Sequence, residues 1–368
     1  MSLLTLVLFI AGIVLLIAGA ELLVRGASRL AVAAGITPLV VGLTVVAFGT
    51  GSPELAVGIQ ASITGQADIT VGNVVGSNIF NVLFILGLSA LVAPLIVSQQ
   101  LVRLDVPLMI LVSAVVLLMA MDGTISRFDG VLLAGGSIGY TVMLIRISRR
   151  ETAKVKAEYE AAYGAGPVAD VGRWPIHVLL VLLGLGLLVI GSDWLVDGAV
   201  VIANAFGVSE LIIGLTIIAA GTSLPEVATS VIAGLRGERD IAVGNVVGSN
   251  LFNILVVVGI TAMVSANGLR VATPAINFDM PVMLAAAVLC LPIFFVHNRI
   301  GRWEGALFLG YYICYTLYLV LATSQHDALG EFSFVMKYII IPVTVMTVSI
   351  AMIRELKRRA RAAPGGSA

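Results

Sequence analysis

The sequence predicts an all-α polytopic membrane protein. Hydrophobic residues make up 59% of the 368 residues and only 11% are charged, which gives a mean hydropathy of +1.09. A composition this apolar excludes a soluble globular domain, and a bilayer core needs about 20 apolar residues for each helix that spans it. An internal repeat and the placement of the basic residues then predict how the helices are arranged.

Apolar runs of spanning length follow one another along the chain. The first 24 residues contain no Lys or Arg, so the first run is interpreted as a retained helix rather than a cleaved signal peptide. A polar stretch at 147–174 separates five runs from six more. The predicted spans lie near 3–22, 38–63, 70–96, 105–121 and 129–146, then near 175–195, 208–235, 241–265, 279–297 and 304–323, and last near 334–353.

Two blocks of sequence occur in both halves, 172 residues apart. Residues 47–54 read AFGTGSPE and residues 219–226 read AAGTSLPE, while residues 72–81 and 244–253 agree at nine of ten positions. Each half is therefore predicted to be one five-helix unit, and an odd number of spans gives the second unit the opposite orientation in the membrane. The expected organisation is a first repeat at 1–146 with its motif at 47–81, a cytoplasmic linker at 147–174, a second repeat at 175–323 with its motif at 219–253, and an added helix with a basic tail at 324–368.

The basic residues agree with this topology. With the amino terminus outside, 18 of the 21 Lys and Arg residues fall in loops or ends assigned to the cytoplasm, and only Arg127, Arg270 and Lys337 fall outside. The positive-inside rule therefore predicts a multi-pass protein of the plasma (inner) membrane. Its amino terminus is expected outside, and its linker and carboxyl terminus in the cytoplasm.

The repeated blocks place one acid in each half, Glu54 and Glu226, inside apolar runs that contain no Lys or Arg. A charge at the bilayer centre costs roughly 2.5–3.5 kcal/mol, so such acids indicate function. Gly and Pro in each block interrupt a helix and free backbone carbonyls, which are tolerated at membrane depth only where they are buried or line a cavity. Hydroxyl and amide side chains recur beside them. An all-oxygen set suits Ca²⁺ or Na⁺ and leaves Mn²⁺ open, whereas softer metals favour His or Cys.

These paired blocks resemble the α-repeats of the sodium/calcium exchanger family, within the calcium/cation antiporters. The resemblance covers about residues 1–323. It implies ten core helices, ion sites near the midplane on helices two, three, seven and eight, and sliding of helices one and six to switch access. It also implies that Glu54 and Glu226 are ligands shared by Ca²⁺ and Na⁺. The flanking ligands that it implies are Thr50, Thr222, Ser77, Ser249, Asn81, Asn253 and the backbone carbonyls of Ala47 and Ala219.

The chain departs from the family pattern at two positions. The family has a serine after the threonine of the first block, which the second copy keeps as Ser223. The first copy has Gly51 there and Ser52 one place later, so Ser52 is a candidate ligand in its stead. Several relatives carry Asp where this chain has Asn253, so one negative charge is absent. The further acids typical of the proton-coupled branch are not seen in these blocks.

We therefore expect a secondary transporter, not an enzyme, that exchanges Ca²⁺ for Na⁺ by alternating access. The alternatives are an antiporter that couples Ca²⁺ or another divalent cation to H⁺, and a cation channel. An intramembrane serine protease is disfavoured because a nucleophilic serine needs a base, and no His or Lys lies at membrane depth. The expected surroundings are the lipid bilayer and the expected substrates Ca²⁺ and Na⁺. We expect no cofactor and no nucleic-acid partner, and the sequence identifies no protein partner.

Overall fold

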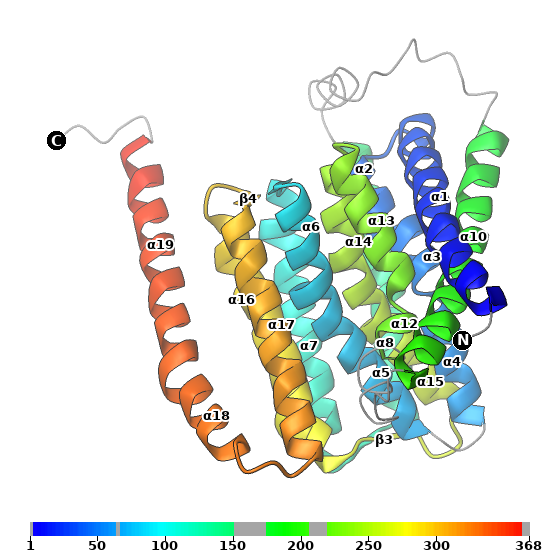
Figure 1. Cartoon of the computed structure of the whole chain (residues 1–368). Helices are drawn as coiled ribbons and strands as arrows, with labels where there is room; N and C mark the ends of the chain where they lie inside the picture. Colours follow the sequence, from blue (N-terminus) through cyan, green and yellow to red (C-terminus); the bar gives the residue numbers. More distant parts are fainter. Residues whose placement is uncertain (1–2, 64–66, 151–173, 206–218, 363–368) are drawn as a thin grey trace.

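The computed structural model of the protein describes residues 3–63, 67–150, 174–205 and 219–362, and nearly all of them are helical (Figure 1). Within these ranges nine helices are long and apolar enough to cross a membrane, and Pro38–Thr50 with Ser52–Ile63 forms a tenth span bent by 45°. The prediction of an all-helical membrane protein is confirmed. The remaining predicted span, 208–235, is described only from residue 219 on, where the short apolar helix Leu224–Leu235 lies.

The helices follow one another in the same order in the two halves. The first half contains α1 (Leu3–Ala34), α2 (Pro38–Val41), α3 (Ala47–Thr50), α4 (Ser52–Ile63), α5 (Ala67–Ile79), α6 (Gly87–Val92), α7 (Val106–Met119) and α8 (Arg127–Arg150). The second contains α10 (Trp174–Ala205), α12 (Ala219–Gly221), α13 (Leu224–Leu235), α14 (Arg239–Phe252), α15 (Gly259–Val264), α16 (Met280–Phe295) and α17 (Arg302–Thr323), and α18 (Leu329–Val335) and α19 (Ile341–Ala362) come last.

Wider π-helical turns interrupt these helices, and four of them lie at matching places in the two halves. Because a π-turn places an extra residue in the helix, it often marks a functional position. The segment η2 begins next to Asn81 and the segment η7 begins at Asn253, so both repeated asparagines lie in such a turn. The π segments are η1 (Gly42–Val46), η2 (Phe80–Leu86), η3 (Leu101–Asp105), η7 (Asn253–Val258), η8 (Ala275–Asp279) and η9 (Met336–Ile340).

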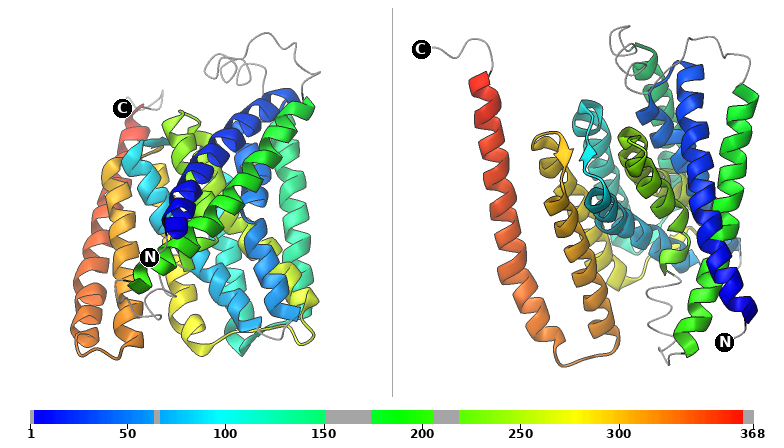
Figure 2. Two further views of the ribbon diagram at one scale, coloured as in Figure 1. Left: turned by 45° about the vertical axis from the view of Figure 1, so that its right-hand side comes forward. Right: turned by 45° about the horizontal axis from the view of Figure 1, so that its top comes forward.

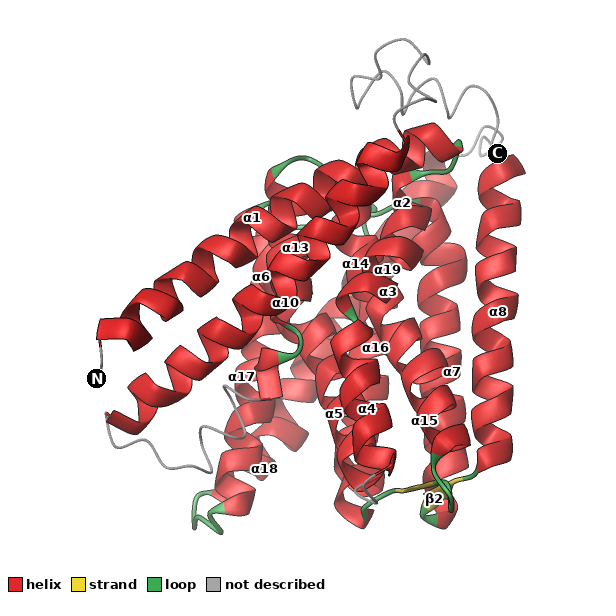
Figure 3. Ribbon diagram, turned by 90° about the vertical axis from the view of Figure 1, so that its right-hand side faces the viewer, coloured by secondary structure: helices red, strands yellow, loops and turns green. Residues whose placement is uncertain are grey.

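Helices α1 and α10 extend about ten residues beyond their predicted ends, to 32 residues each. At 1.5 Å per residue such a helix is longer than the hydrocarbon core is thick, so it must tilt. Figure 3 shows the two helices side by side, running obliquely across the bundle. Glycines allow this close approach: a Cβ on Gly12 would lie 2.8 Å from the Gly191 carbonyl, and one on Gly19 would lie 2.8 Å from the Gly184 carbonyl.

The centre of the bundle is formed by the two helices that carry the matching blocks 72–81 and 244–253. In the most apolar 18-residue stretch of each span, 89% of residues are buried in Arg239–Val264 and 78% in Ile69–Val92, against 22% in Arg127–Ser148 and 11% in Arg302–Thr323. Two short antiparallel sheets connect the halves at the two ends. Strand β1 (Leu95–Ile96) pairs with β4 (Arg299–Ile300), and β2 (Thr124–Ile125) pairs with β3 (Leu269–Arg270). Each sheet therefore joins one strand from each half.

The last helical segment, α18–η9–α19, lies at the side of the bundle against α16 and α17 (Figures 1 and 2). None of its most apolar stretch is buried by the rest of the described protein, so in a bilayer this segment faces lipid over most of its surface. The end of α19 and strand β4 lie at one end of the bundle, and β3 with Arg270 lies at the opposite end (Figure 1).

Candidate functional site

The bent spans position the two repeated glutamates. The first span breaks at Gly51, between α3 and α4, and in the second half residues Thr222 and Ser223 form a turn between α12 and α13. Glu54 and Glu226 therefore lie in the first turn of a new helix, where the unpaired N–H groups favour a negative charge. Each glutamate is only 1% exposed.

The two carboxylates lie close enough to repel each other. In each, the Oε2 oxygen has no hydrogen-bond partner among the described residues. Neither glutamate takes part in an ion pair in the described part of the chain, in contrast to Glu21 and Glu355. A carboxylate that is buried without a counter-charge is costly, so the pair forms an anionic site that favours a cation.

Ser223 connects the two repeated blocks across the halves. Its hydroxyl lies 3.3 Å from Oε1 of Glu54, to which it donates, and 3.3 Å from the Ser77 hydroxyl. Ser223 is completely buried and Ser77 is 2% exposed. A serine of the second half therefore lies against a glutamate and a serine of the first.

The amides form two matching bonds between η2 and the end of α14, and between η7 and α5. The Asn81 amide donates to Asn250 Oδ1 at 3.3 Å, and the Asn253 amide donates to Asn78 Oδ1 at 3.0 Å. The two bonds are equivalent, because Asn253 occupies the position of Asn81 and Asn250 that of Asn78, each 172 residues further along the chain. Asn78 and Asn250 are not among the ligands predicted from the sequence, although both lie inside the repeated block near Asn81 and Asn253.

The two threonines differ in their surroundings. The Thr50 hydroxyl donates to Asn245 Oδ1 at 3.3 Å, and the Asn245 amide donates to Ser230 Oγ at 3.0 Å. The equivalent threonine, Thr222, has no hydrogen-bond partner for its hydroxyl within the described ranges. The amide nitrogen of Asn73, the equivalent of Asn245, also lacks a partner in these ranges, because the position equivalent to Ser230 is Gly58, which has no hydroxyl.

The backbone carbonyls near the breaks have partners of their own. The Ala47 carbonyl accepts the N–H of Gly51 at 3.0 Å and retains a second lone pair. The turn of the second half is bonded one residue later, from the N–H of Ser223 to the Ala220 carbonyl at 3.2 Å, and not to Ala219. The Gly221 carbonyl accepts the hydroxyl of Ser192 on α10 at 2.7 Å.

The structure does not bring Ser52 to this site. Its side chain is exposed, and its hydroxyl donates at 2.7 Å to the carbonyl of Phe48 in α3, one turn earlier in the same bent span. The position equivalent to Ser223 is Gly51, where a Cβ would lie 2.7 Å from the Phe252 ring. The hydroxyl that Ser223 supplies on one side is therefore missing on the other. The buried Ser249 hydroxyl, equivalent to Ser77, accordingly lacks a partner in the described structure.

Several buried oxygens of the repeated blocks have no hydrogen-bond partner in the described ranges. Carboxylate, amide and hydroxyl oxygens are the ligands that hard cations such as Ca²⁺ and Na⁺ prefer. The described residues contain no group of three or more His, Cys, Asp and Glu side chains that could hold a metal ion, so a cation bound here would need amide, hydroxyl or carbonyl oxygens besides the two carboxylates. The oxygens are Oε2 of Glu54 and Glu226, Oδ1 of Asn81 and Asn253, Oγ of Ser249 and Oγ1 of Thr222.

Comparison with known proteins bears on these two halves. The family model described as "Sodium/calcium exchanger protein" matches residues 4–146 and 176–321. The chain belongs to the sodium/calcium exchanger family. It is 39% identical to the putative antiporter CaxA of Alkalimonas amylolytica, over 74% of this chain and 84% of that protein. It is 29% identical to the sodium/calcium exchanger MaX1 of Methanosarcina acetivorans, over 75% of this chain and 87% of that protein.

Among solved structures, the chain is similar to the sodium-calcium exchanger NCX_Mj. The TM-score is 0.72 at 31% identity, over 85% of this chain and 98% of that one. This exchanger-family protein is thus a multi-pass membrane transporter, and the family match ends at residue 321, before α18 begins at Leu329.

Proposed function

We propose that this exchanger-family protein moves Ca²⁺ in exchange for Na⁺ by alternating access, with both ions bound between Glu54 and Glu226. The observation that carries the proposal is the convergence of two buried carboxylates, one from each half, each with a free oxygen and without a cationic side chain among the described residues. The relatives MaX1 and NCX_Mj, both named as sodium/calcium exchangers, favour the same pair of ions.

The charge of the site supplies a coupling mechanism. The two carboxylates carry two negative charges, which one Ca²⁺ or two Na⁺ ions neutralise. Competition for one anionic site couples the two ions without a mechanical link between separate pathways. With no ion bound, the buried and unpaired carboxylates oppose occlusion, because their desolvation is then uncompensated. This opposition suppresses uncoupled return of the transporter and favours an antiporter over a channel.

A transport assay tests the coupling ion. The purified protein in lipid vesicles is loaded with Na⁺, with K⁺, or with a pH gradient, and ⁴⁵Ca²⁺ uptake is measured. We expect rapid, saturable uptake only into Na⁺-loaded vesicles. Uptake driven by the pH gradient and indifferent to Na⁺ would assign H⁺ as the coupling ion. Non-saturating flux that needs no counter-ion would indicate a channel.

Two substitutions test the site itself. Glu54→Gln and Glu226→Gln each preserve side-chain volume and remove one charge, so both variants are expected to lose Ca²⁺ exchange while they still insert and elute as the wild type does. The matched control is Glu331→Gln, which removes an exposed acid of α18 and should leave exchange unchanged. Near wild-type exchange by both site variants would show that the ions bind elsewhere.

We also propose that the amino terminus lies outside and that the 147–174 linker and the carboxyl tail lie in the cytoplasm. The proposal is supported by the placement of 18 of the 21 basic residues. A Glu160→Cys variant in intact cells should resist an impermeant thiol reagent and react after the cells are opened. The native Cys290 and Cys314 are replaced by serine in the background used. Efficient labelling of intact cells at position 160 would reverse the orientation.

A further inference from the structure

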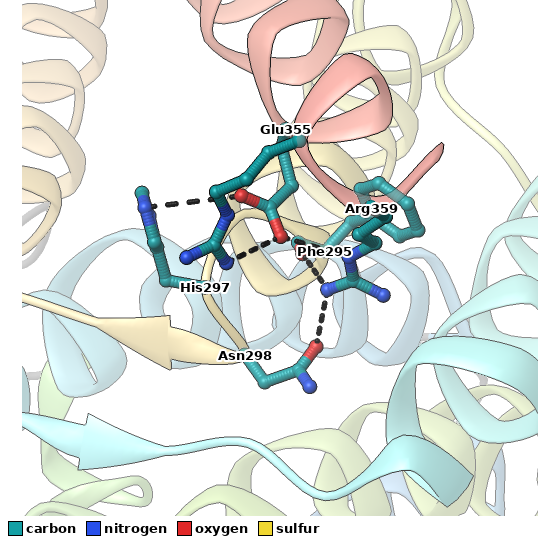
Figure 4. A network of polar contacts seen from close by, with 6 residues as sticks. Phe295, His297, Asn298, Glu355 and Arg359 are labelled. Carbon is teal, nitrogen blue, oxygen red and sulfur yellow. Dashed lines mark hydrogen bonds and ion pairs between the residues drawn. The ribbon is translucent and has the colours of Figure 1, made fainter. Parts of the chain in front are cut away.

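The added segment α18–η9–α19 contacts the family core at two levels. At the end of α19, Arg359 donates to the Phe295 carbonyl at 2.8 Å and to Asn298 Oδ1 at 3.1 Å, and Glu355 accepts from Arg359 at 2.8 Å (Figure 4). The Arg359 guanidinium also lies over the Phe295 ring, 4.2 Å from its centre. Further along the helix, the Tyr311 hydroxyl of α17 donates to Thr344 Oγ1 at 2.7 Å.

Beside the second of these contacts lies a cleft of about 530 Å³. This volume is in the range of about 300–1,000 Å³ that small-molecule sites occupy. Its lining is almost wholly aliphatic and aromatic. It comes from η2, η8, α16 and α17 on one side and from α18, η9 and the start of α19 on the other. The aromatic wall is formed by Phe278, Tyr315 and Tyr318, whose rings stack.

The arrangement of the walls limits what fits in this cleft. The Tyr311–Thr344 bond holds the two walls in direct contact, while a helix of a partner would need interaxial distances of about 8–10 Å on each of its sides. The surroundings are membrane-crossing helices, so the molecules that reach the cleft are lipids. A flexible acyl chain is thin enough to enter, and it buries apolar surface against apolar walls.

One cation identifies the headgroup. Lys337 lines the cleft, and its ammonium lies 5.8 Å from the centre of the Tyr338 ring. No ion pair connects it to an acid of the described structure, in contrast to Arg358 and Arg359 on the same segment. A lysine on a membrane helix extends its long side chain toward the headgroup region, where its ammonium attracts the net negative charge of an anionic headgroup.

We propose that this cleft is a binding site for one anionic phospholipid, with an acyl chain between α16–α17 and the added segment and with the phosphate at Lys337. The lipid fills the space that separates the added helix from the family core. The segment is thereby joined to the core by lipid as well as by the Arg359 and Tyr311 contacts.

Native mass spectrometry of the full-length protein in detergent tests the site, with added palmitoyl-oleoyl phosphatidylglycerol or the matching phosphatidylcholine as probes. We expect tighter binding of phosphatidylglycerol by the wild type. Lys337→Gln should weaken phosphatidylglycerol binding about fivefold, as expected from the loss of one basic residue near the membrane surface, and leave phosphatidylcholine binding unchanged. Lys357→Gln, on the exposed side of α19, is the matched control and should change neither.

A second pair of variants tests the cleft independently of the headgroup. Ala285 is exposed and lines the cleft, so Ala285→Phe should fill it and reduce binding of both lipids. Val288, one turn further along α16, is also exposed and lies outside the lining, so Val288→Phe should bind both lipids as the wild type does. Equal phosphatidylglycerol binding by the Lys337 and Lys357 variants would overturn the headgroup assignment. Equal lipid binding by the Ala285 and Val288 variants would overturn the cleft.

Discussion

The asymmetry between the two halves can be tested with a pair of serines. Ser223→Ala removes a completely buried hydroxyl that contacts Glu54 and Ser77, each at 3.3 Å. Ser52→Ala removes an exposed hydroxyl that donates to the carbonyl of Phe48, four residues earlier in the same bent span. The sequence presents both as candidate ligands, and the structure separates them. We therefore expect a large effect on Ca²⁺ exchange from the first change and none from the second.

The size of the effect follows from the geometry. A hydrogen bond to a charged group contributes about 1.5–3 kcal/mol, but 3.3 Å is longer than the usual ~2.7–2.8 Å for an O–H···O bond, so the lower value applies. About 1.5 kcal/mol corresponds to a change of roughly tenfold in affinity. Ser223→Ala should raise the half-saturating Ca²⁺ concentration by about this factor. A deleted hydroxyl on an exposed position changes stability by less than about 0.5 kcal/mol.

The assay is initial ⁴⁵Ca²⁺ uptake into Na⁺-loaded vesicles over a range of external Ca²⁺, with the amount of reconstituted protein measured for each variant. Ser223→Thr, which keeps a hydroxyl, should recover part of the affinity if its added methyl group is accommodated. Equal half-saturating concentrations for the two alanine variants, or a greater loss for Ser52→Ala, would refute the placement of the ligands.

Three further predictions concern the frame around the site. Gly248→Ala should lower the midpoint of thermal unfolding, by an amount equivalent to about 1–3 kcal/mol, because its Cβ would lie 2.7 Å from the backbone of η1; Gly139→Ala, on an exposed face of α8, should not. Glu355→Gln should make the peptide bonds between α17 and α18 more sensitive to protease, because Glu355 binds Arg358 and Arg359 at the end of α19. Ca²⁺ exchange should persist, because this segment lies beyond the family match, and lost exchange would contradict the prediction. The exposed ion pair between Glu21 and Arg236 joins α1 to the end of α13 and is screened by salt. Glu21→Gln should therefore change the exchange rate by at most about fivefold and remove part of the dependence of that rate on added choline chloride. An unchanged salt dependence would show that the ion pair has no part in the rate-limiting step.

The sequence by itself determined the class of protein and the elements of the site. Its composition indicated membrane-spanning helices, because 59% hydrophobic and 11% charged residues leave too few polar side chains for the surface of a soluble domain. The spacing of 172 residues between Glu54 and Glu226 identified both as functional residues, because a charged side chain inside an apolar span is costly. Proline and glycine in the same blocks indicated the broken helices, and the structure has a bend of 45° at Gly51 and a turn at Ser223.

The sequence could not place the ends of α1 and α10. Their predicted ends followed the first charged residues, whereas both helices continue for about another ten residues. Polar side chains near the membrane surface do not end a helix whose glycines pack closely on a partner. In the parts beyond the predicted ends, a Cβ on Gly26 would lie 3.0 Å from the His177 carbonyl and one on Gly198 would lie 2.8 Å from the Phe9 side chain; these contacts are tertiary, and no local signal contains them.

Only the tertiary structure decided which repeated residues meet. Sequence identity at an offset of 172 treats both copies as equivalent, yet Ser223 contacts Glu54 and Ser77 while the Phe252 ring occupies the space beside Gly51. It also showed that Ser52 points away from the site. The physical reason is that a ligand set at membrane depth is made by helices far apart in the chain. Which oxygens converge depends on helix rotation and on the packing of neighbouring side chains, and neither is encoded by spacing along one helix.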